Sequence, residues 1–412
     1  MTLVPILMYH EIADKDNLWC VKPEEFKKQM AFLKENGFIA ITLDDLYNNL
    51  KNNKEIPNKA VILTFDDGRR GVHDHAFPLL KELGFKAVLY IVADWADGGK
   101  VPDEEKYSEF LSWAQIKELA NYFEIGCHGK SHRNLVKLDE DEFKKEIFDS
   151  KKEIEGMLGK KVCHFSYPYG FFNEKIKRMI LEAGYKTAVT VNKGMNRELL
   201  ELSRQWVLNN TTIEDFKRLI SVPTLSLCMI TKDEEEHLAG CLSSVKSIAD
   251  EIIIIDTGSK DKTKDIAKGF TGKVYDFQWQ DDFSKARNFS LSKATKDWIL
   301  VLDADEAIAE KDLIKIKELI TNKDIMGYRF VTRNYTDDSS ITGWLPAVGY
   351  EESRDFSGFF PSIKVRLFQN SKGIKFEGII HEIVDDYIEK IKGKIVLADI
   401  PIHHYGAVRD RE

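Results

Sequence analysis

Short apolar runs alternate with amphipathic stretches through the first half of the chain. The helical stretch that begins near residue 23 places Phe26, Met30 and Leu33 on one face, because positions i, i+4 and i+7 of a helix point the same way. No hairpin signal separates the runs, so the pattern predicts parallel strands joined by helices in a barrel-like α/β fold. The predicted strands are residues 4–9, 38–42, 60–65, 87–92, 123–127, 162–167 and 187–191, and the predicted helices are residues 23–36, 72–83, 113–122 and 139–158.

The alternation restarts near residues 221–223, which predicts a second domain with an open βαβ sheet. Two domains, residues 1–220 and 221–412, agree with the usual domain size of roughly 150–220 residues. A long segment at 335–361 is rich in Gly, Ser and aromatic residues and is predicted to be a functional loop. The strands predicted here are residues 225–230, 251–255 and 298–302, and the helices are residues 234–245 and 262–268.

Composition narrows the class of protein. The 412 residues are 43% hydrophobic and 31% charged, as in soluble globular proteins. A net charge of -8, with no basic cluster interleaved with aromatic residues, argues against a nucleic-acid partner. The five scattered cysteines contain no C-x-x-C and favour a reducing compartment. No apolar run approaches the ~20 residues that span a bilayer, and the N-terminus lacks the features of a signal peptide, so we predict a cytoplasmic protein.

A first group of chemically active residues follows the apolar strand at 60–65. Asp66 and Asp67 come at its end, and His128 and His132 are spaced i, i+4, which predicts that they share one side of a helical turn. One carboxylate and two imidazoles would give a divalent ion three protein ligands, and the other carboxylate would serve as a base. Taken singly, these motifs are more often a turn and a solvated helix face, but together in one domain they favour a metal site.

With P-Y-G at 168–170, these motifs resemble the polysaccharide deacetylases of carbohydrate esterase family 4. That family consists of distorted (β/α) barrels that remove N-acetyl groups from glycans containing N-acetylglucosamine. The resemblance covers about residues 1–220. It implies a divalent metal, with zinc the first choice, and these roles: general base Asp66, metal ligands Asp67, His128 and His132, and an oxyanion contact from the backbone N–H of Tyr169.

Two departures from the family pattern affect the catalytic assignments. The family's third motif usually opens with an arginine, and here that position is Ser166. The usual late Leu-x-x-His is missing between residues 170 and 220, but L-M-Y-H at 7–10 has that pattern. The branch of the family that acts on poly-N-acetylglucosamine resembles this permuted order, which makes His10 the candidate general acid. The alternative is a buried histidine satisfied by the backbone.

A second acidic group lies in the C-terminal half. The buried strand at 251–255 ends in Asp256 and a Gly-containing turn, which suits a carboxylate that binds a nucleotide base or ribose. Asp303 and Asp305 follow the strand at 298–302, and alternate residues of an extended chain point the same way. Oxygen ligands that bridge phosphates suit Mg²⁺ or Mn²⁺, and Arg287 could face a phosphate. A lone D-x-D is otherwise most often a capped turn.

In this order, the motifs resemble family 2 glycosyltransferases of the GT-A fold, a Rossmann-like open sheet, over about residues 223–406. The segment 229–234 is similar to that family's first nucleotide loop, which makes Thr231 and Glu234 nucleotide-sugar contacts together with Asp256, Arg287 and Asp303. Thr257 stands where a second Asp is commoner. The resemblance implies inverting transfer from a nucleotide sugar, a UDP-sugar first. Further candidates are Asp305 as a metal ligand, Glu382 as the base (or a structural ion pair) and His404 as a ligand (or a packed histidine).

We therefore predict a bifunctional carbohydrate-active enzyme of surface-glycan or glycoconjugate assembly. Its substrates would be a glycan or glycolipid that contains N-acetylglucosamine, and a nucleotide sugar. Two alternatives stay open. One is an active transferase that carries a degenerate, glycan-binding deacetylase-like module, and the other is an active deacetylase with a nucleotide-sugar-binding module.

Overall fold

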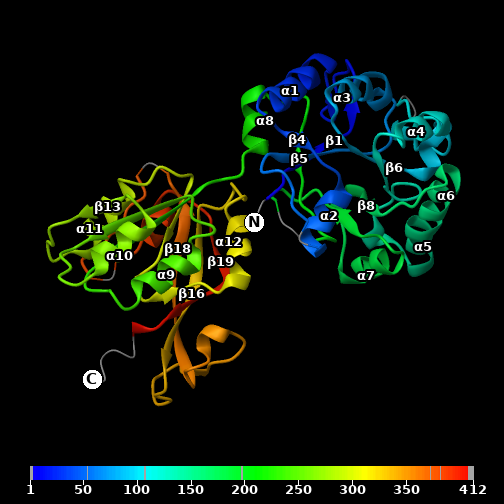
Figure 1. Cartoon of the computed structure of the whole chain (residues 1–412). Helices are drawn as coiled ribbons and strands as arrows, with labels where there is room; N and C mark the ends of the chain where they lie inside the picture. The colour runs from blue at the N-terminus through cyan, green and yellow to red at the C-terminus, as the bar shows by residue number, and fades with distance from the viewer. Residues whose placement is uncertain are drawn as a thin grey trace. The chain divides into compact units, whose positions relative to one another are not determined.

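The computed structural model describes residues 3–52, 54–105, 108–195, 198–371, 373–380 and 382–406. The chain divides into two compact units, of which one ends at Val222 and the other begins at Pro223. In Figure 1 the first runs from blue to green and the second from green to red. Within the described ranges, no helix is long and apolar enough to cross a membrane.

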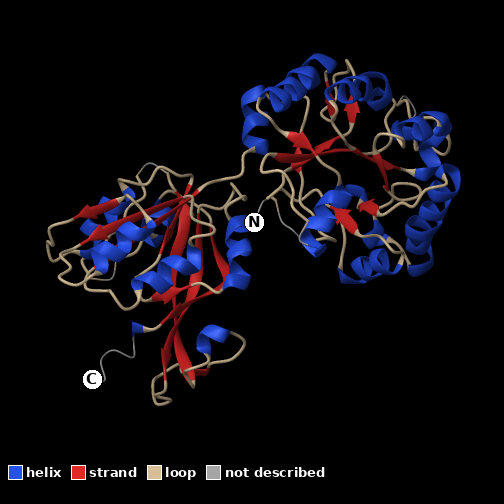
Figure 2. Cartoon of the chain, in the orientation of Figure 1, coloured by secondary structure: helices blue, strands red, loops and turns tan. Residues whose placement is uncertain are grey.

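A curled parallel sheet surrounded by helices forms the N-terminal unit (Figure 2). Each strand pairs in parallel with its neighbours, and β4 (Ile39–Ala40) pairs with β5 at the side. The predicted barrel-like fold is therefore confirmed. The order along the sheet is β10 (Gln205–Trp206), β1 (Ile6–Tyr9), β5 (Ala60–Phe65), β6 (Val88–Ile91), β7 (Glu124–Cys127), β8 (His164–Ser166) and β9 (Thr187–Val189).

Local sequence signals explain where the helices of this unit begin and end. Ser112 and Asp139 each form a capping box that satisfies free N–H groups at a helix start. Gly84 and Gly159 end helices in the left-handed conformation. The helices are α1 (Pro23–Glu35), α2 (Leu43–Asn52), α3 (Phe77–Leu83), α4 (Trp113–Leu119), α5 (Glu140–Lys144), α6 (Ser150–Leu158), α7 (Glu174–Glu182) and α8 (Ile213–Ile220). The predicted helix at 139–158 contains a π-helical turn, Lys145–Asp149, between α5 and α6.

The C-terminal unit is built on one mixed sheet. Strands β11 to β14 are mutually parallel where they pair, and β18 joins β14 in antiparallel fashion. This is the predicted GT-A type of open sheet. The order is β13 (Val274–Asp276), β12 (Glu251–Asp256), β11 (Leu225–Thr231), β14 (Trp298–Val301), β18 (Gly358–Gln369), β16 (Gly327–Thr336), β19 (Ile395–His404) and β15 (Glu306–Ala307), with β17 (Leu345–Pro346) beside β18.

Both faces of this sheet are covered. In β12, Ile252 and Ile254 belong to one apolar core and Ile253 and Ile255 to another, because successive side chains of a strand point to opposite faces. The helices are α9 (Leu238–Val245), α10 (Thr263–Phe270), α11 (Phe283–Leu291), α12 (Leu313–Leu319) and α13 (Asp385–Lys390). The segment predicted as a loop at 335–361 is shorter than expected, since β16 and β18 extend into it from both sides.

Candidate active sites

The acidic pair of the N-terminal unit lies where β5 ends. Asp67 and Gly68 both have positive φ, 72° and 70°, so the chain turns sharply directly after Asp66. The N–H of Asp66 donates to the carbonyl of Tyr9 at 2.9 Å, which ties the turn to the end of β1 beside His10. Both carboxylates are buried, so their charges require partners inside the protein.

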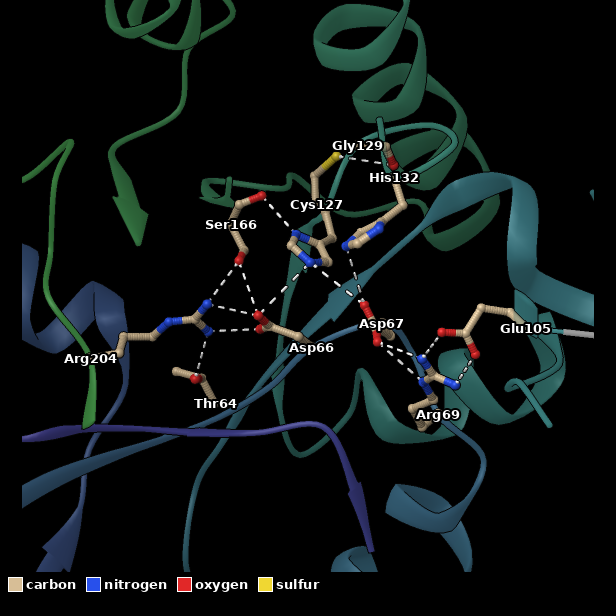
Figure 3. A network of polar contacts seen from close by, with 11 residues as sticks. Thr64, Asp66, Asp67, Arg69, Glu105, Cys127, Gly129, His132, Ser166 and Arg204 are labelled. Carbon is tan, nitrogen blue, oxygen red and sulfur yellow. Dashed lines mark hydrogen bonds and ion pairs between the residues drawn. The ribbon is translucent and has the colours of Figure 1, made fainter. Parts of the chain in front are cut away.

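The two predicted histidines converge on Asp67, and Figure 3 shows this approach for His132. The Nε2 atoms of His128 and His132 each lie 3.6 Å from Asp67 Oδ1. The prediction that they share a helical turn is wrong: the segment that follows β7 is irregular, with φ of 83° at Gly129 and 59° at His132. The Glu146 carboxylate stabilises this loop, since it accepts the N–H groups of residues 130 and 131 at 2.8 and 3.0 Å.

These three side chains fit a divalent cation. His128 Nδ1 lies 2.8 Å from the carbonyl oxygen of Ser166, which can only accept, so Nδ1 donates this hydrogen bond and Nε2 is the ring atom left to face a cation. Burial, with the neighbouring His128, lowers the pKa of His132 to about 4, so the His132 ring is neutral near pH 7. Asp67 Oδ1 is buried without a hydrogen-bond partner. Three acceptor atoms within 4.8 Å of one another therefore face a common point.

His10 and Tyr169 border this cluster. His10 packs against Trp19 with 4.6 Å between ring centroids, and its Nδ1 is buried without a hydrogen-bond partner. Burial lowers the pKa of His10, although the nearby charges of Asp67 and Asp66 act to raise it. Tyr169 has φ of 59° in the turn Pro168–Gly170, and its ring lies 4.6 Å from that of His132.

In the C-terminal unit, two buried acceptor atoms lie at the ends of adjacent strands. Thr231 and Asp256 are paired in the register of β11 and β12. Asp256 Oδ1 accepts the N–H groups of Gly258 and Ser259, both at 3.0 Å, whereas Asp256 Oδ2 and Thr231 Oγ1 have no hydrogen-bond partner. The N–H of Glu234 donates to the Thr263 hydroxyl at 2.6 Å, which joins the loop after β11 to the start of α10.

The other predicted residues of this unit form a charged network. Asp303 pairs with Arg287, and Arg287 Nε also lies 3.3 Å from Glu382 Oε1. The Nη1 atom of the buried Arg287 has no hydrogen-bond partner. Asp305 Oδ2 lies 3.4 Å from His404 Nε2, and His404 Nδ1 lies 2.8 Å from Asn334 Oδ1. Burial opposes protonation of His404, but Asp305 raises its pKa above the ordinary value. A proton on His404, or a divalent ion between His404 and Asp305, would therefore balance the charge of the carboxylate.

Comparisons with known proteins assign each half of the chain. Residues 53–188 match the model of the polysaccharide deacetylase family, and residues 226–371 match that of glycosyl transferase family 2. The chain thus carries one segment similar to polysaccharide deacetylases and one similar to family 2 glycosyl transferases, hereafter the deacetylase domain and the transferase domain.

Three relatives illustrate the two kinds of similarity. The YxkH protein of Bacillus subtilis (strain 168) is 32% identical over 46% of this chain and 65% of its own length. The SPbeta prophage-derived glycosyltransferase SunS, also of Bacillus subtilis (strain 168), is 28% identical over 45% of this chain and 40% of its own. The poly-beta-1,6-N-acetyl-D-glucosamine N-deacetylase of Escherichia coli (strain K12) is 23% identical over 52% of this chain and 38% of its own. The chain thus spans less than two thirds of each relative.

An arginine of the deacetylase domain that was not predicted from the sequence contacts Asp66. Arg204 is fully buried and donates to both oxygens of Asp66, each at 2.7 Å. It also donates to the hydroxyls of Thr64 and Ser166 at 3.1 and 3.2 Å (Figure 3). Burial acts to raise the pKa of Asp66, but Arg204, together with the nearby His128 and His10, outweighs it, so the pKa lies below its ordinary value. An arginine beside the buried strand β10 is the signal that could have revealed it.

A second missed arginine lies in the transferase domain. Arg366, on the central strand β18, donates to Glu306 Oε1 at 2.6 Å and lies 3.5 Å from Asp303 Oδ2. Asp303 thus lies between Arg287 and Arg366, and its charge is neutralised from two sides. Here too, the sequence offered one signal, a charged residue (Arg366) within a largely apolar strand.

Proposed function

We propose that the chain is a bifunctional enzyme of surface-glycan or glycoconjugate assembly. Its deacetylase domain would remove N-acetyl groups from a glycan or glycolipid that contains N-acetylglucosamine, in a metal-dependent reaction. Its transferase domain would transfer a sugar from a nucleotide sugar with inversion. We assign these activities to residues 1–220 and 221–412. The observation that carries the first activity is the ligand set of Asp67, His128 and His132 beside an Asp66 that is held ionised.

In the deacetylase reaction, a C–N bond of the N-acetyl group is replaced by a C–O bond to water, and the amine leaves with a proton. A bound divalent ion, zinc first, would polarise the acetyl carbonyl and acidify a water. Asp66 takes the proton of that water, and Arg204 keeps Asp66 ionised for this role. His10 gives a proton to the amine, and the backbone N–H of Tyr169 donates to the oxyanion.

The similarity to a poly-beta-1,6-N-acetyl-D-glucosamine N-deacetylase supports the substrate class. The alternative of a degenerate glycan-binding module rested on Ser166 in place of an arginine. Arg204 speaks against it, because an arginine from the segment just before β10 donates to both oxygens of the Asp66 carboxylate. The five free cysteines support a reducing, cytoplasmic location.

In the transferase domain, the unpaired Asp256 Oδ2 suits an N–H donor of a nucleobase, uracil first, and the unpaired Thr231 hydroxyl, which can donate or accept, suits a second polar group of the nucleotide. Glu234 lies on the same nucleotide loop. The free Nη1 of Arg287 suits a diphosphate oxygen, and Asp303 orients that arginine.

Asp305 and His404 would hold Mn²⁺ or Mg²⁺ against the diphosphate of the donor. Glu382 would take the proton of the acceptor hydroxyl as the inverting base. Arg287 Nε lies 3.3 Å from Glu382 Oε1, so only one of the two carboxylate oxygens of Glu382 takes part in this ion pair.

Two assays test the two halves of the proposal. Incubation with short N-acetylglucosamine oligomers should release acetate, and the metal content should be one ion per deacetylase site. A thermal-shift screen of nucleotide sugars, with and without Mn²⁺, should show a metal-dependent stabilisation. Absence of acetate release by a metal-loaded chain would refute the deacetylase assignment, and metal-independent nucleotide-sugar binding would refute the transferase site.

A further inference from the structure

The two oxygens of the Asp67 carboxylate have different surroundings. Oδ2 accepts two hydrogen bonds from Arg69, from Nε at 3.2 Å and from Nη2 at 2.9 Å. Oδ1 accepts none and faces the Nε2 atoms of His128 and His132, each 3.6 Å away. The guanidinium therefore occupies one oxygen and leaves the other for the cation site.

Arg69 is itself held in place. Its Nη1 and Nη2 donate to the two oxygens of Glu105 at 2.7 and 2.9 Å, and Ser108 donates to Glu105 at 2.6 Å. The Phe110 ring lies under the guanidinium, 4.9 Å from Cζ, and Arg69 and Phe110 form a backbone bridge. A planar group with this many fixed contacts cannot turn away from Asp67 (Figure 3).

This arrangement has a consequence for coordination. A carboxylate can bind a cation through one oxygen or through both, and binding through both would occupy a position that a catalytic metal site keeps open for water and substrate. Because Arg69 claims Oδ2, Asp67 can offer only Oδ1. Arg69 carries no lone pair and stays protonated, so it is neither a ligand nor a base.

We propose that Arg69, anchored by Glu105, is a positioning residue that makes Asp67 a one-oxygen ligand and keeps a coordination position free. The inference rests on the proposed metal-dependent deacetylase. Loss of Arg69 would free Oδ2, so that Asp67 would turn, bind in a second mode and hold the ion less firmly. Partners of metal ligands commonly contribute ~10–100-fold to metal affinity.

The test uses the full chain with Zn²⁺ and Co²⁺ as probes. Arg69→Met should weaken Zn²⁺ binding ~10–100-fold and should alter the visible absorption of bound Co²⁺, which reports coordination geometry. Arg69→Lys keeps the charge but not the planar fork and should show the same change of spectrum. Glu105→Gln, which leaves Arg69 present, should weaken binding less and covers the case in which the Arg69 variants do not fold. Arg70→Met, at a half-exposed neighbour that pairs with Asp74, is the matched control.

The outcomes separate the inference from the function on which it rests. Unchanged Zn²⁺ affinity and Co²⁺ absorption in Arg69→Met, or in Glu105→Gln where Arg69→Met does not fold, would overturn the positioning role. Tighter binding in Arg69→Met with wild-type behaviour in Arg69→Lys would also overturn it, because Arg69 would then act only through its charge. If the wild-type chain binds no ion whose binding depends on His128, as judged with His128→Ala, the proposed deacetylase site itself would be refuted.

Discussion

The two domains each place an acidic pair after a buried strand, but they prepare these pairs differently. In the deacetylase domain, Asp67 Oδ1 already faces two imidazoles at 3.6 Å. In the transferase domain, Asp305 faces the single imidazole of His404 at 3.4 Å. Among the residues that the structure describes, no further His, Cys, Asp or Glu completes a comparable group around that pair.

This difference indicates when each ion would bind. A site with a carboxylate and two imidazoles can retain a cation by itself, as zinc sites with three protein ligands do. A site with one carboxylate and one imidazole needs oxygen atoms from elsewhere, and a diphosphate supplies them. The comparison therefore predicts a resident metal in the deacetylase domain and a metal that binds together with the nucleotide sugar in the transferase domain.

Removal of one imidazole should have the largest effect. We expect His128→Ala to lose the stoichiometric metal and all acetate release, because only one carboxylate and one imidazole would remain. Metal analysis after dialysis and an acetate assay measure this. His75→Ala, at an exposed histidine outside the cluster, is the control. Nucleotide-sugar binding should persist in both variants, and metal retained by His128→Ala would show that the ligand set is wrong.

At the other site, Asp305→Ala should abolish sugar transfer and spare deacetylation. The diphosphate and Asp305 are both negative, so donor binding needs a cation between them. Calorimetry should detect Mn²⁺ binding at this site only when the nucleotide is present, and a chelator should weaken donor binding. Tight Mn²⁺ binding by the nucleotide-free chain at Asp305 would contradict the contrast between the two sites.

Within the deacetylase site, the functions of Asp66 and Asp67 should be separable by mutation. Asp66→Asn should keep the metal, because Asp67 and both histidines remain, yet it should lower the rate of acetate release by ~10²–10⁴-fold for a lost general base. Metal content and kcat, measured on the same preparation, check both halves of this statement. Loss of the metal in Asp66→Asn would mean that the roles of the two acids are exchanged.

Much of the fold could be predicted because its signals are local. The run at Glu251–Asp256 is apolar on both faces of the strand, and such a sequence is typical of a strand covered by helices on each side. Helix starts could likewise be predicted from capping residues such as Ser112. The approach of Asp67, His128 and His132 was expected from their motifs and the family resemblance, and from their place after parallel strands, whose ends lie at one edge of the sheet.

What could not be predicted depends on contacts between distant segments. Arg204 and Asp66 are separated by 138 positions, and Arg69 and Glu105 by 36, so no local pattern indicates that they pair. The conformation of the loop that ends at His132 was also mispredicted. An i, i+4 spacing suits a helix, but here the Glu146 carboxylate binds the loop backbone and stabilises an irregular turn.

The smallest predicted effect concerns Arg204, the residue that holds the base. Arg204→Lys keeps a positive charge but loses the planar guanidinium that donates to both oxygens of Asp66 in parallel, and a hydrogen bond to a charged group contributes about 1.5–3 kcal/mol. We therefore expect acetate release to fall ~10–100-fold, since 1.36 kcal/mol corresponds to a factor of ten.

Because Arg204 offsets the effect of burial and lowers the pKa of Asp66, its replacement should raise that pKa and move the acidic limb of the pH–rate profile to higher pH. Ser166→Ala removes a 3.3 Å contact with Asp66 and a 3.2 Å contact with Arg204 but leaves both hydrogen bonds from Arg204 to Asp66, so it should shift the limb less. An acidic limb that does not move in Arg204→Lys would show that this arginine supports the fold and does not tune the base.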